Sequence, residues 1–518
     1  MSRLRRFLPA LLPVCLVVIA GCPTIPGGDT DQGPQLPAYA PDRGPLPYAV
    51  AAADAVEEPF SQAFVYTSIA EAYIDSGLLD EAALVLGRAF SRVSALPEQP
   101  GRTEVLVELA TGYFRAGRAD MAAPILEDAL AAAQEIDDDF SRGLLIQGII
   151  EAAFVGGDAA ADVLRDAVLS VYVIQDLWTR VSILVDVARR YQESGLGFGV
   201  SNLLQQALPA ATGLENPWQK AAAFSEIAGR YAGADEREQA LQQARRAVRE
   251  INSVTVVTRT EEDARHLLTV GDNLAALGLF DEAVSVVQTI EFPYLRAQGL
   301  AEIGRRQIEV DLPSSGNLLL AAATNLLARE PSLYRRALGQ ADLGVDYLEA
   351  GNRQLALVNA TGALELASQI EDQYERSEVL TQVARVYIRI GDTPTAVSVM
   401  GRIEDGYIRS SSLASIAQSL TADGGDREVT LALYEAGFRS AAQAEYLQDG
   451  LYATIAQGFA SADAPARAVE AATRIRDLYS LSVALAGIGR YVSPGSATDA
   501  IGDLEETLVS NWPEVFGT

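Results

Sequence analysis

The phrases IEDQYERS (residues 370–377) and IEDGYIRS (residues 403–410) are nearly identical and recur within a few dozen residues of each other. In each, a carboxylate precedes an aromatic ring, and an arginine follows the ring by two residues. A ring with flanking charges can bind a peptide or a glycan, because the ring stacks and the charges form strong hydrogen bonds. The same letters also suit a helix start, since Asp372 followed by Glu375 fits an N-cap with a capping box.

The aromatic ring and the basic residue two positions later recur along the chain. We interpret them as a structural seam, in which the acid caps a helix, the ring packs against the preceding helices and the arginine pairs locally. The alternative is a ladder of rings along one edge that contacts an extended peptide or glycan. The candidate ladder consists of Trp178, Trp218, Tyr294, Tyr334, Tyr374 and Tyr407.

A second row of side chains could bind carboxylates. It comprises Arg189, Arg305, Arg385 and Arg490, which stand at equivalent places in successive helical patterns. Guanidinium groups match carboxylates in a bidentate geometry, so this row would suit a partner with acidic groups. A solvated helix face explains the same row without any ligand.

These residues are positioned by a repeated pair of helices. Leu380, Val383, Ala384 and Tyr387 are spaced as one face of a helix. Gly391 supplies a helix stop, and a proline three residues later suits the first turn of a second helix. The pattern therefore predicts an antiparallel helix pair.

The pair recurs to the end of the chain, at intervals near 33 or near 40 residues. The two interval classes differ by about two helical turns, so the longer units keep the same buried face. We take the position of Tyr387 as the anchor of each unit. Its equivalents are Tyr73, Tyr113, Ala153, Tyr191, Tyr231, Leu274, Gln307, Tyr347, Tyr387, Leu420, Phe459 and, most loosely, Val492.

The units resemble the tetratricopeptide repeat (TPR). Residues 66–89, YTSIAEAYIDSGLLDEAALVLGRA, show the family's spacing of large, small and aromatic positions, and residues 106–129 repeat it. Many units are longer than the family's usual length, and the closing proline is mostly missing. The resemblance implies an all-α, right-handed α-solenoid of about twelve TPR-like antiparallel helix pairs over residues 56–518. It also implies a concave groove that binds other proteins.

The N-terminus has the features of an export signal. Three arginines precede an apolar run, and Ile19-Ala20-Gly21-Cys22 resembles the bacterial lipobox. The resemblance implies a signal peptide at 1–21, a lipid on Cys22 and, without an aspartate at position 23, an outer-membrane lipoprotein facing the periplasm. Residues 22–55 are rich in proline and glycine and predict a tether. Beyond Cys22 we find no run of eighteen apolar residues, so we expect membrane contact through the lipid anchor only.

Composition excludes several classes of function. The net charge of −29 disfavours nucleic acid as a partner, because phosphate binding needs a basic face. A single histidine and the two cysteines, Cys15 and Cys22, exclude His-based triads, His-rich zinc sites and a disulfide framework. No catalytic motif, metal site or cofactor site is recognisable. The covalent lipid is the only group that we expect.

The sequence thus predicts a non-enzymatic, membrane-anchored scaffold that binds envelope proteins or peptides along a solenoid groove. The alternative is an envelope lipoprotein that binds or cleaves glycans with its rings and carboxylates. The identity of the partner and the oligomeric state do not follow from the sequence.

Overall fold

The computed structural model describes residues 36–96, 100–195, 199–254 and 260–517, and within them it is all-helical. The signal peptide, Cys22 and the first part of the predicted tether lie outside the described residues. Residues 36–518 form one compact unit, to which the following description applies.

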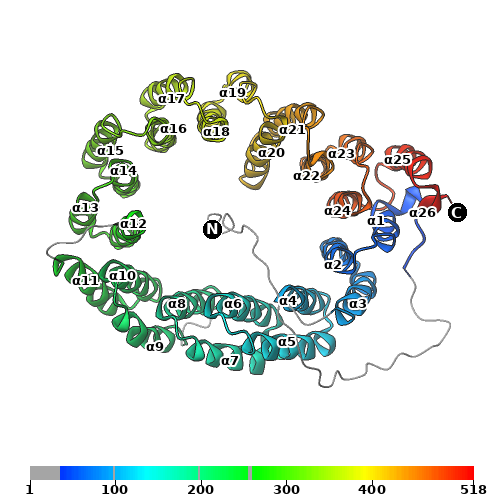
Figure 1. Cartoon of the computed structure of the whole chain (residues 1–518), viewed down its shortest axis with the longest axis horizontal. Helices are drawn as coiled ribbons and strands as arrows, with labels where there is room; N and C mark the ends of the chain where they lie inside the picture. The colour runs from blue at the N-terminus through cyan, green and yellow to red at the C-terminus, as the bar shows by residue number, and fades with distance from the viewer. Residues whose placement is uncertain (1–35, 97–99, 196–198, 255–259, 518) are drawn as a thin grey trace. The chain divides into compact units, whose positions relative to one another are not determined.

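Twelve helices form the inner row of this unit (Figure 1). They are α2 (Pro59–Asp75), α4 (Pro100–Arg115), α6 (Asp139–Gly156), α8 (Leu177–Glu193), α10 (Pro217–Gly233), α12 (Glu261–Ala276), α14 (Pro293–Glu309), α16 (Leu333–Glu349), α18 (Gln373–Ile390), α20 (Gly406–Ala422), α22 (Gln448–Ser461) and α24 (Leu478–Gly489).

The outer row alternates with the inner row along the chain. It contains α3 (Leu79–Ser94), α5 (Ala119–Gln134), α7 (Ala161–Ser170), α9 (Val200–Gly213), α11 (Arg237–Asn252), α13 (Phe280–Gln288), α15 (Pro313–Leu327), α17 (Arg353–Ala367), α19 (Thr393–Met400), α21 (Arg427–Ala441), α23 (Pro465–Ala472) and α25 (Thr498–Asn511). Shorter elements are η1 (Pro41–Arg43), α1 (Leu46–Asp54), η2 (Gly157–Ala160), η3 (Val171–Val173) and α26 (Pro513–Phe516).

The predicted fold class is confirmed: the body is an all-α solenoid of TPR-like helix pairs. Eleven of the twelve anchors lie in inner helices, and Val492 lies just beyond the end of α24. In the first pair, Ala70, Ala82 and Ala89 are fully buried, so the two helices approach closely at these small residues. Tyr73 and Leu86 fill the space beside them. The spacing that resembles the TPR therefore marks the contact between inner and outer helix.

Many units have a glycine turn at one end of the inner helix and a capped helix start at the other. Gly391 ends α18 with φ 87°, a left-handed conformation that glycine adopts without steric cost. Asp372 caps the start of α18 by accepting a bond from the Glu375 N–H at 2.9 Å. The predicted helix stop and N-cap are thus confirmed. The reciprocal contact of a full capping box is present at α12, between Thr260 and Asp263.

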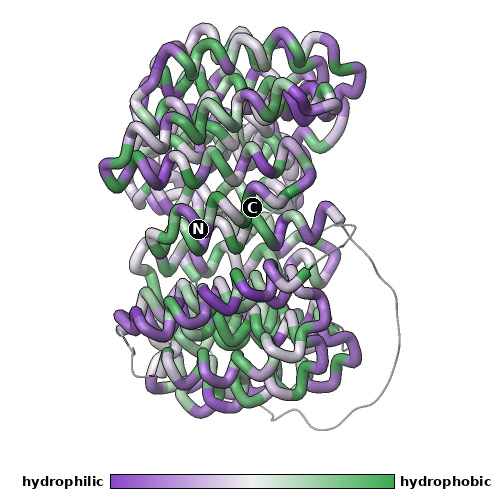
Figure 2. The backbone as a smooth tube through the Cα atoms, turned by 90° about the vertical axis from the view of Figure 1, so that its left-hand side faces the viewer, coloured by the Kyte–Doolittle hydropathy of each residue, from purple (hydrophilic) through white to green (hydrophobic). Residues whose placement is uncertain are grey.

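The helices are amphipathic, and Figure 2 shows hydrophobic and hydrophilic residues interleaved along them. A helix of this kind buries one face and leaves the other in water, so it needs neighbours to be stable. The stretch Asp139–Val173 is long and apolar enough to cross a membrane by length and composition alone. In the structure its residues form α6, η2, α7 and η3, which belong to the third pair.

The two ends of the solenoid meet. Both α1 and α2 pack against α24, so the helix pairs of this unit form a closed ring (Figure 1). On the inner helices, Arg490 Nη2 lies 2.7 Å from the Glu71 carboxylate, and the Ser76 hydroxyl donates to the Gly489 carbonyl at 3.1 Å. The resemblance implied a concave groove in a solenoid, and it gave no sign of closure.

Two boundaries differ from the sequence prediction. The folded body begins at Leu36 rather than at residue 56, because η1 and α1 form within the predicted tether and α1 is buried against other helices. The last pair also differs: α24 packs on α1, whereas α25 contacts α23, α26 and η1. In place of the outer helix that follows it, the twelfth inner helix therefore packs on a helix from the other end of the chain.

Candidate partner-binding surfaces

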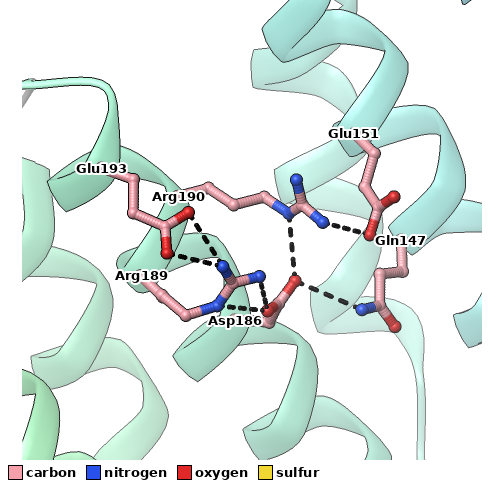
Figure 3. Close-up of polar contacts among 6 residues, drawn as sticks. All are labelled: Gln147, Glu151, Asp186, Arg189, Arg190 and Glu193. Carbon is pink, nitrogen blue, oxygen red and sulfur yellow. Dashed lines mark hydrogen bonds and ion pairs between the residues drawn. The ribbon is translucent and has the colours of Figure 1, made fainter. Parts of the chain in front are cut away.

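The predicted arginine row lies on inner helices or directly after one, and three of its members, Arg189, Arg305 and Arg490, contact the chain's own carboxylates. Arg189 of α8 donates to Asp186 at 2.5 and 3.0 Å and to both oxygens of Glu193 at 2.8 Å (Figure 3). These partners stand three residues before and four residues after it on the same helix. The guanidinium is thus held between two carboxylates, where a ligand would have to compete for it.

The same cluster joins two adjacent inner helices. Arg190 of α8 pairs with Glu151 of α6 and lies 3.2 Å from Asp186. Gln147 of α6 also donates to Asp186, at 3.2 Å (Figure 3). The cluster therefore links the third and fourth units through their inner helices.

A second cluster of the same kind surrounds Arg305 in α14. Arg305 donates to Glu302 at 2.5 Å, pairs with Glu309 and lies 3.5 Å from Glu349 of α16. Its neighbour Arg306 reaches back to Asp272 of α12 at 2.6 Å. One short stretch of α14 thereby connects three consecutive inner helices.

The other two arginines of the row lie farther along the chain. Arg490, at the end of α24, pairs with Glu71 and lies 3.6 Å from Asp75, both on α2. Arg385 lies in α18 and is partly buried. At Arg189, Arg305 and Arg490, intramolecular ion pairs thus occupy the groups that would meet an acidic ligand.

Two short stretches of the sequence contain a charge pattern that predicts these ion-pair clusters, although our sequence prediction did not include them. Residues 186–193 read DVARRYQE and residues 302–309 read EIGRRQIE. Both have an acid three residues before a pair of arginines and a glutamate four residues after the first of them. Such spacings place the charges on one helix face. The repeated pattern predicts ion pairs on the helix itself rather than an open binding site.

Two carboxyl groups on the inner helices have strongly raised pKa values. Burial, reinforced by the charges of Asp342 and Glu349, raises the pKa of Asp346 in α16 to about 7. Burial raises the pKa of Glu226 in α10 to about 7, against the lowering effect of Arg230. These groups titrate near neutral pH.

No group of three or more His, Cys, Asp or Glu side chains placed to hold a metal occurs in the part of the chain that the structure describes.

The arginine of the recurring phrase is a structural residue. Arg376 donates to the Ile370 carbonyl at 3.0 Å, beyond the last turn of the preceding outer helix. The same bond recurs six residues apart at other seams. These are Arg142 to Ile136, Arg180 to Ile174, Arg296 to Ile290 and Arg409 to Ile403. Carbonyls at helix ends need donors, so at these five seams the arginine joins the outer helix to the next inner helix.

The candidate ladder of rings divides into packed and exposed members. Trp218 is fully buried, and Trp178 packs edge-on against His266 with centroids 5.0 Å apart. Tyr294 accepts a bond from Gln298, and Tyr334 donates to Glu378. These four rings thus have contacts within the fold, and those of Trp178 and Tyr334 are with the later helices α12 and α18 rather than with the preceding pair.

Other rings at the seams face solvent. Tyr374 is 69% exposed, which contradicts the expectation that it packs against the preceding pair. Tyr407 lies 5.0 Å from the ring of Tyr446, whose hydroxyl donates to Asp405 at 3.0 Å. Because inner helices alternate with antiparallel outer helices, their N-termini lie along one edge of the ring, which we call the seam rim. Exposed rings at seam-rim positions are Phe60, Phe140, Tyr374, Tyr446 and Tyr479.

Comparisons with known proteins do not identify a family for this chain. No family model matches the chain. No curated protein matches it either. Among solved structures, the chain is similar to a protein from Thermococcus onnurineus NA1 at 18% identity, over 64% of this chain and 94% of that one, with a TM-score of 0.29.

Two further solved structures show the same level of similarity. A Rap protein complexed with Competence and Sporulation Factor is 14% identical over 73% of this chain and 98% of that one, with a TM-score of 0.27. A signal transduction ATPase with a tetratricopeptide repeat sensor from Pyrococcus horikoshii is 11% identical, over 75% of this chain and 64% of that one, with a TM-score of 0.26. The fold assignment rests on the helix pairs of this chain itself.

Proposed function

We propose that the chain is a membrane-anchored scaffold of a bacterial cell envelope, facing the periplasm, that binds proteins or peptides through the seam rim. The observation that carries this proposal is the set of exposed rings on that rim, led by Tyr374 (69% exposed) and Phe140 (63% exposed). Exposed aromatic side chains are enriched in protein interfaces, where they anchor a partner with little loss of side-chain entropy.

The charges of the rim favour a partner with basic groups. The helix-capping carboxylates Asp138, Asp372 and Asp405 stand on this edge beside the rings. The seam arginines Arg376 and Arg409 donate to backbone carbonyls, so their donors are partly used inside the fold. Carboxylates beside exposed rings complement lysine and arginine side chains, both by charge and by cation–π contact.

Membrane attachment is supported by the lipobox-like residues 19–22. We expect Cys22→Ala to release the protein from membranes into the soluble fraction, because one thiol carries the whole lipid anchor. Fractionation of cells that express the full-length chain measures this. Unchanged membrane retention of the variant would refute the lipid anchor without bearing on the rim.

The rim is tested by site-specific photocrosslinking in the full-length, membrane-bound protein. A crosslinker at Tyr374 should capture a defined set of envelope proteins, and Phe140→Ser with Tyr446→Ser should reduce that capture severalfold. The matched control is a crosslinker at Val358, which is 60% exposed on the outer helix α17. Equal capture from both positions would contradict the proposed binding surface.

The same rings and carboxylates would suit a glycan, which is the alternative function. Purified protein should then be retained on isolated cell-wall glycan in a Tyr374-dependent manner, without a polypeptide crosslinked at that position. Release of soluble sugar fragments in the same incubation would indicate cleavage. Either result would replace the protein scaffold with the glycan function.

A further inference from the structure

The junction between the first and last units is built differently from the others. At every other unit, the inner helix packs on the outer helix that follows it directly in sequence. At α24, α1 takes the place of that outer helix, although it lies more than four hundred residues earlier in the chain. No short connection in the chain joins the two sides of this junction. It alone can therefore separate fully without stretching or breaking the backbone.

The apolar contacts explain why α1 occupies this place. The helix α24 is apolar along its length, so it needs cover on more than one side. In α1, Tyr48, Ala49, Ala52 and Ala53 are fully buried. Leu46 lies so close to Gly489 that a Cβ at position 489 would overlap its side chain. The pairing of α1 with α24 thus depends on a glycine facing a leucine.

Aromatic and polar contacts extend the junction to the C-terminal helices. The ring of Tyr48 lies 6.4 Å from Phe516 and 5.1 Å from Tyr39. The Tyr48 hydroxyl donates to Glu505 of α25 at 2.7 Å, and Gly495 N–H donates to the Asp42 carbonyl at 2.8 Å. Tyr48 is therefore the side chain that joins α1 to α25 and α26 together.

The attachment of α1 to the first unit is of another kind. Gln62 of α2 donates to the Ala53 carbonyl at 2.8 Å, and Arg88 of α3 pairs with Asp54 at 2.6 Å. Tyr66 of α2 also donates to Asp54. These bonds hold the end of α1 to α2 and α3, which follow it after a short connection. Separation from α24 leaves all of them intact.

The junction is also incompletely filled. A pocket of about 230 Å³, partly open to solvent, lies between residues 37–47, the end of α2 with the start of α3, and the end of α24. Tyr73 lines it, and its hydroxyl is buried without a hydrogen-bond partner among the described residues. Unfilled space removes dispersion contacts, and an unpaired buried hydroxyl costs free energy. Both features weaken this junction.

We propose that residues 36–54 form a clasp, and that the ring opens where α24 meets α1 and α2, while α1 stays bound to α2 and α3. Opening also breaks the contacts of Arg490 with Glu71 and of Ser76 with Gly489. Opening is a two-state event at one defined junction, and it exposes the apolar face of α24. This inference concerns the conformational cycle of the body and does not depend on the seam rim or on the lipid anchor.

The closed state can be trapped by a disulfide. Leu46→Cys with Gly489→Cys, in a full-length chain whose Cys15 and Cys22 are replaced by serine, places two thiols at the Leu46–Gly489 contact. The matched control is Val287→Cys with Gly299→Cys, which spans an ordinary junction between α13 and α14, where Val287 lies against Gly299. Both variants are compared oxidised and reduced, so each serves as its own reference.

Hydrogen–deuterium exchange measures the opening. In the reduced variant with Leu46→Cys and Gly489→Cys, we expect the amides of α24 to exchange at least about tenfold faster than those of α14 and α16. Oxidation of this variant should remove the difference. The control disulfide should leave α24 exchange unchanged. Tyr48→Ala should accelerate α24 exchange further and leave α8 to α18 unaffected. Equal protection of α24 and α14 in the reduced protein, or no change on oxidation, would overturn the clasp.

Discussion

The inner helices fall into two arcs that are held together by different physical means. Between α2 and α18, ion pairs join several of the adjacent inner helices, such as Arg190 with Glu151 and Arg306 with Asp272. From α20 to α24, no charged residue stands beyond the first four residues of an inner helix. There, Gln457 of α22 donates to the Val483 carbonyl of α24, above Gly487.

The difference shows that one solenoid can join its successive inner helices in two ways. The first nine inner helices, the charged arc, contain opposing charges whose interaction depends on pH and on salt. The last three, the uncharged arc, rely on close packing of small residues, which depends on volume. Perturbations of volume and of charge should therefore act selectively on the two arcs.

The largest effect should come from added volume in the uncharged arc. Gly458→Val in α22 would place a Cβ inside the ring of Tyr434, which is fully buried. We expect the free energy of unfolding to fall by about 1–3 kcal/mol, as in other overpacked cores. Chemical denaturation measures it. Gly450→Ala in the same helix meets no atom within 4 Å and should be neutral or slightly stabilising; equal losses for both variants would contradict the packing explanation.

The next effect concerns pH and the charged arc. The pKa of Asp346 is raised to about 7, so the folded state binds a proton more tightly than the unfolded chain does. The stability of the wild type should thus fall as pH rises from about 4 through about 7. Asp346→Asn should be more stable than the wild type at pH 8 by about 1–2 kcal/mol and equal to it below pH 4.

Thermal unfolding across this pH range measures the difference. Glu506→Gln, an exposed carboxylate of α25, is the control and should show no comparable gain at pH 8. A gain for Asp346→Asn that was the same at pH 4 and pH 8 would rule out ionisation of Asp346 as its cause.

A smaller effect is expected for the ion pairs themselves. Arg305→Met removes contacts to Glu302, Glu309 and Glu349 and should cost about 1 kcal/mol at low salt. Because the pair is partly exposed, added sodium chloride should shrink the difference from the wild type. Gln457→Met in the uncharged arc should show no such salt dependence. A loss at Arg305 that persisted in high salt would point to packing of its aliphatic stem instead.

The smallest effect should come from the hydrogen bond between an arginine and an isoleucine carbonyl, which occurs at seams in both arcs. Arg376→Met removes the donor to the Ile370 carbonyl, and we expect a loss of about 0.5–1 kcal/mol. Arg402→Met, an exposed arginine on the same rim, is the comparison and should change stability by less. Because the bond recurs at Arg409 in the uncharged arc, Arg409→Met should cost a similar amount.

The sequence predicted what local spacing determines. The anchors mark the inner helices because most of them are buried aromatic or aliphatic side chains at the contact between an inner and an outer helix. Asp372 and Gly391 were correctly assigned because caps and stops depend on a few adjacent residues. The exposure of Tyr374 was not predictable in the same way, since the same letters precede the half-buried Tyr407.

Features that depend on contacts between distant parts of the chain are harder to predict from the sequence. The residues of α1, LPYAVAAAD, directly follow a proline-rich stretch, so the sequence predicts that they belong to the tether. They form a buried helix because α24 covers them, and the local sequence pattern does not predict which helix will do so. The same holds for the ring as a whole, because closure results from the summed rotation of all the units. No single unit encodes that sum.

The closed ring also limits how such a protein can change over evolutionary time. An open repeat array can gain or lose a unit by gene duplication or deletion, and only its end units must then be shielded from water. Here the end units shield each other, through Arg490 with Glu71 and through α1 on α24. One unit more or fewer would move these partners apart. The number of units is therefore fixed by geometry, and variation is confined to the lengths of individual helices.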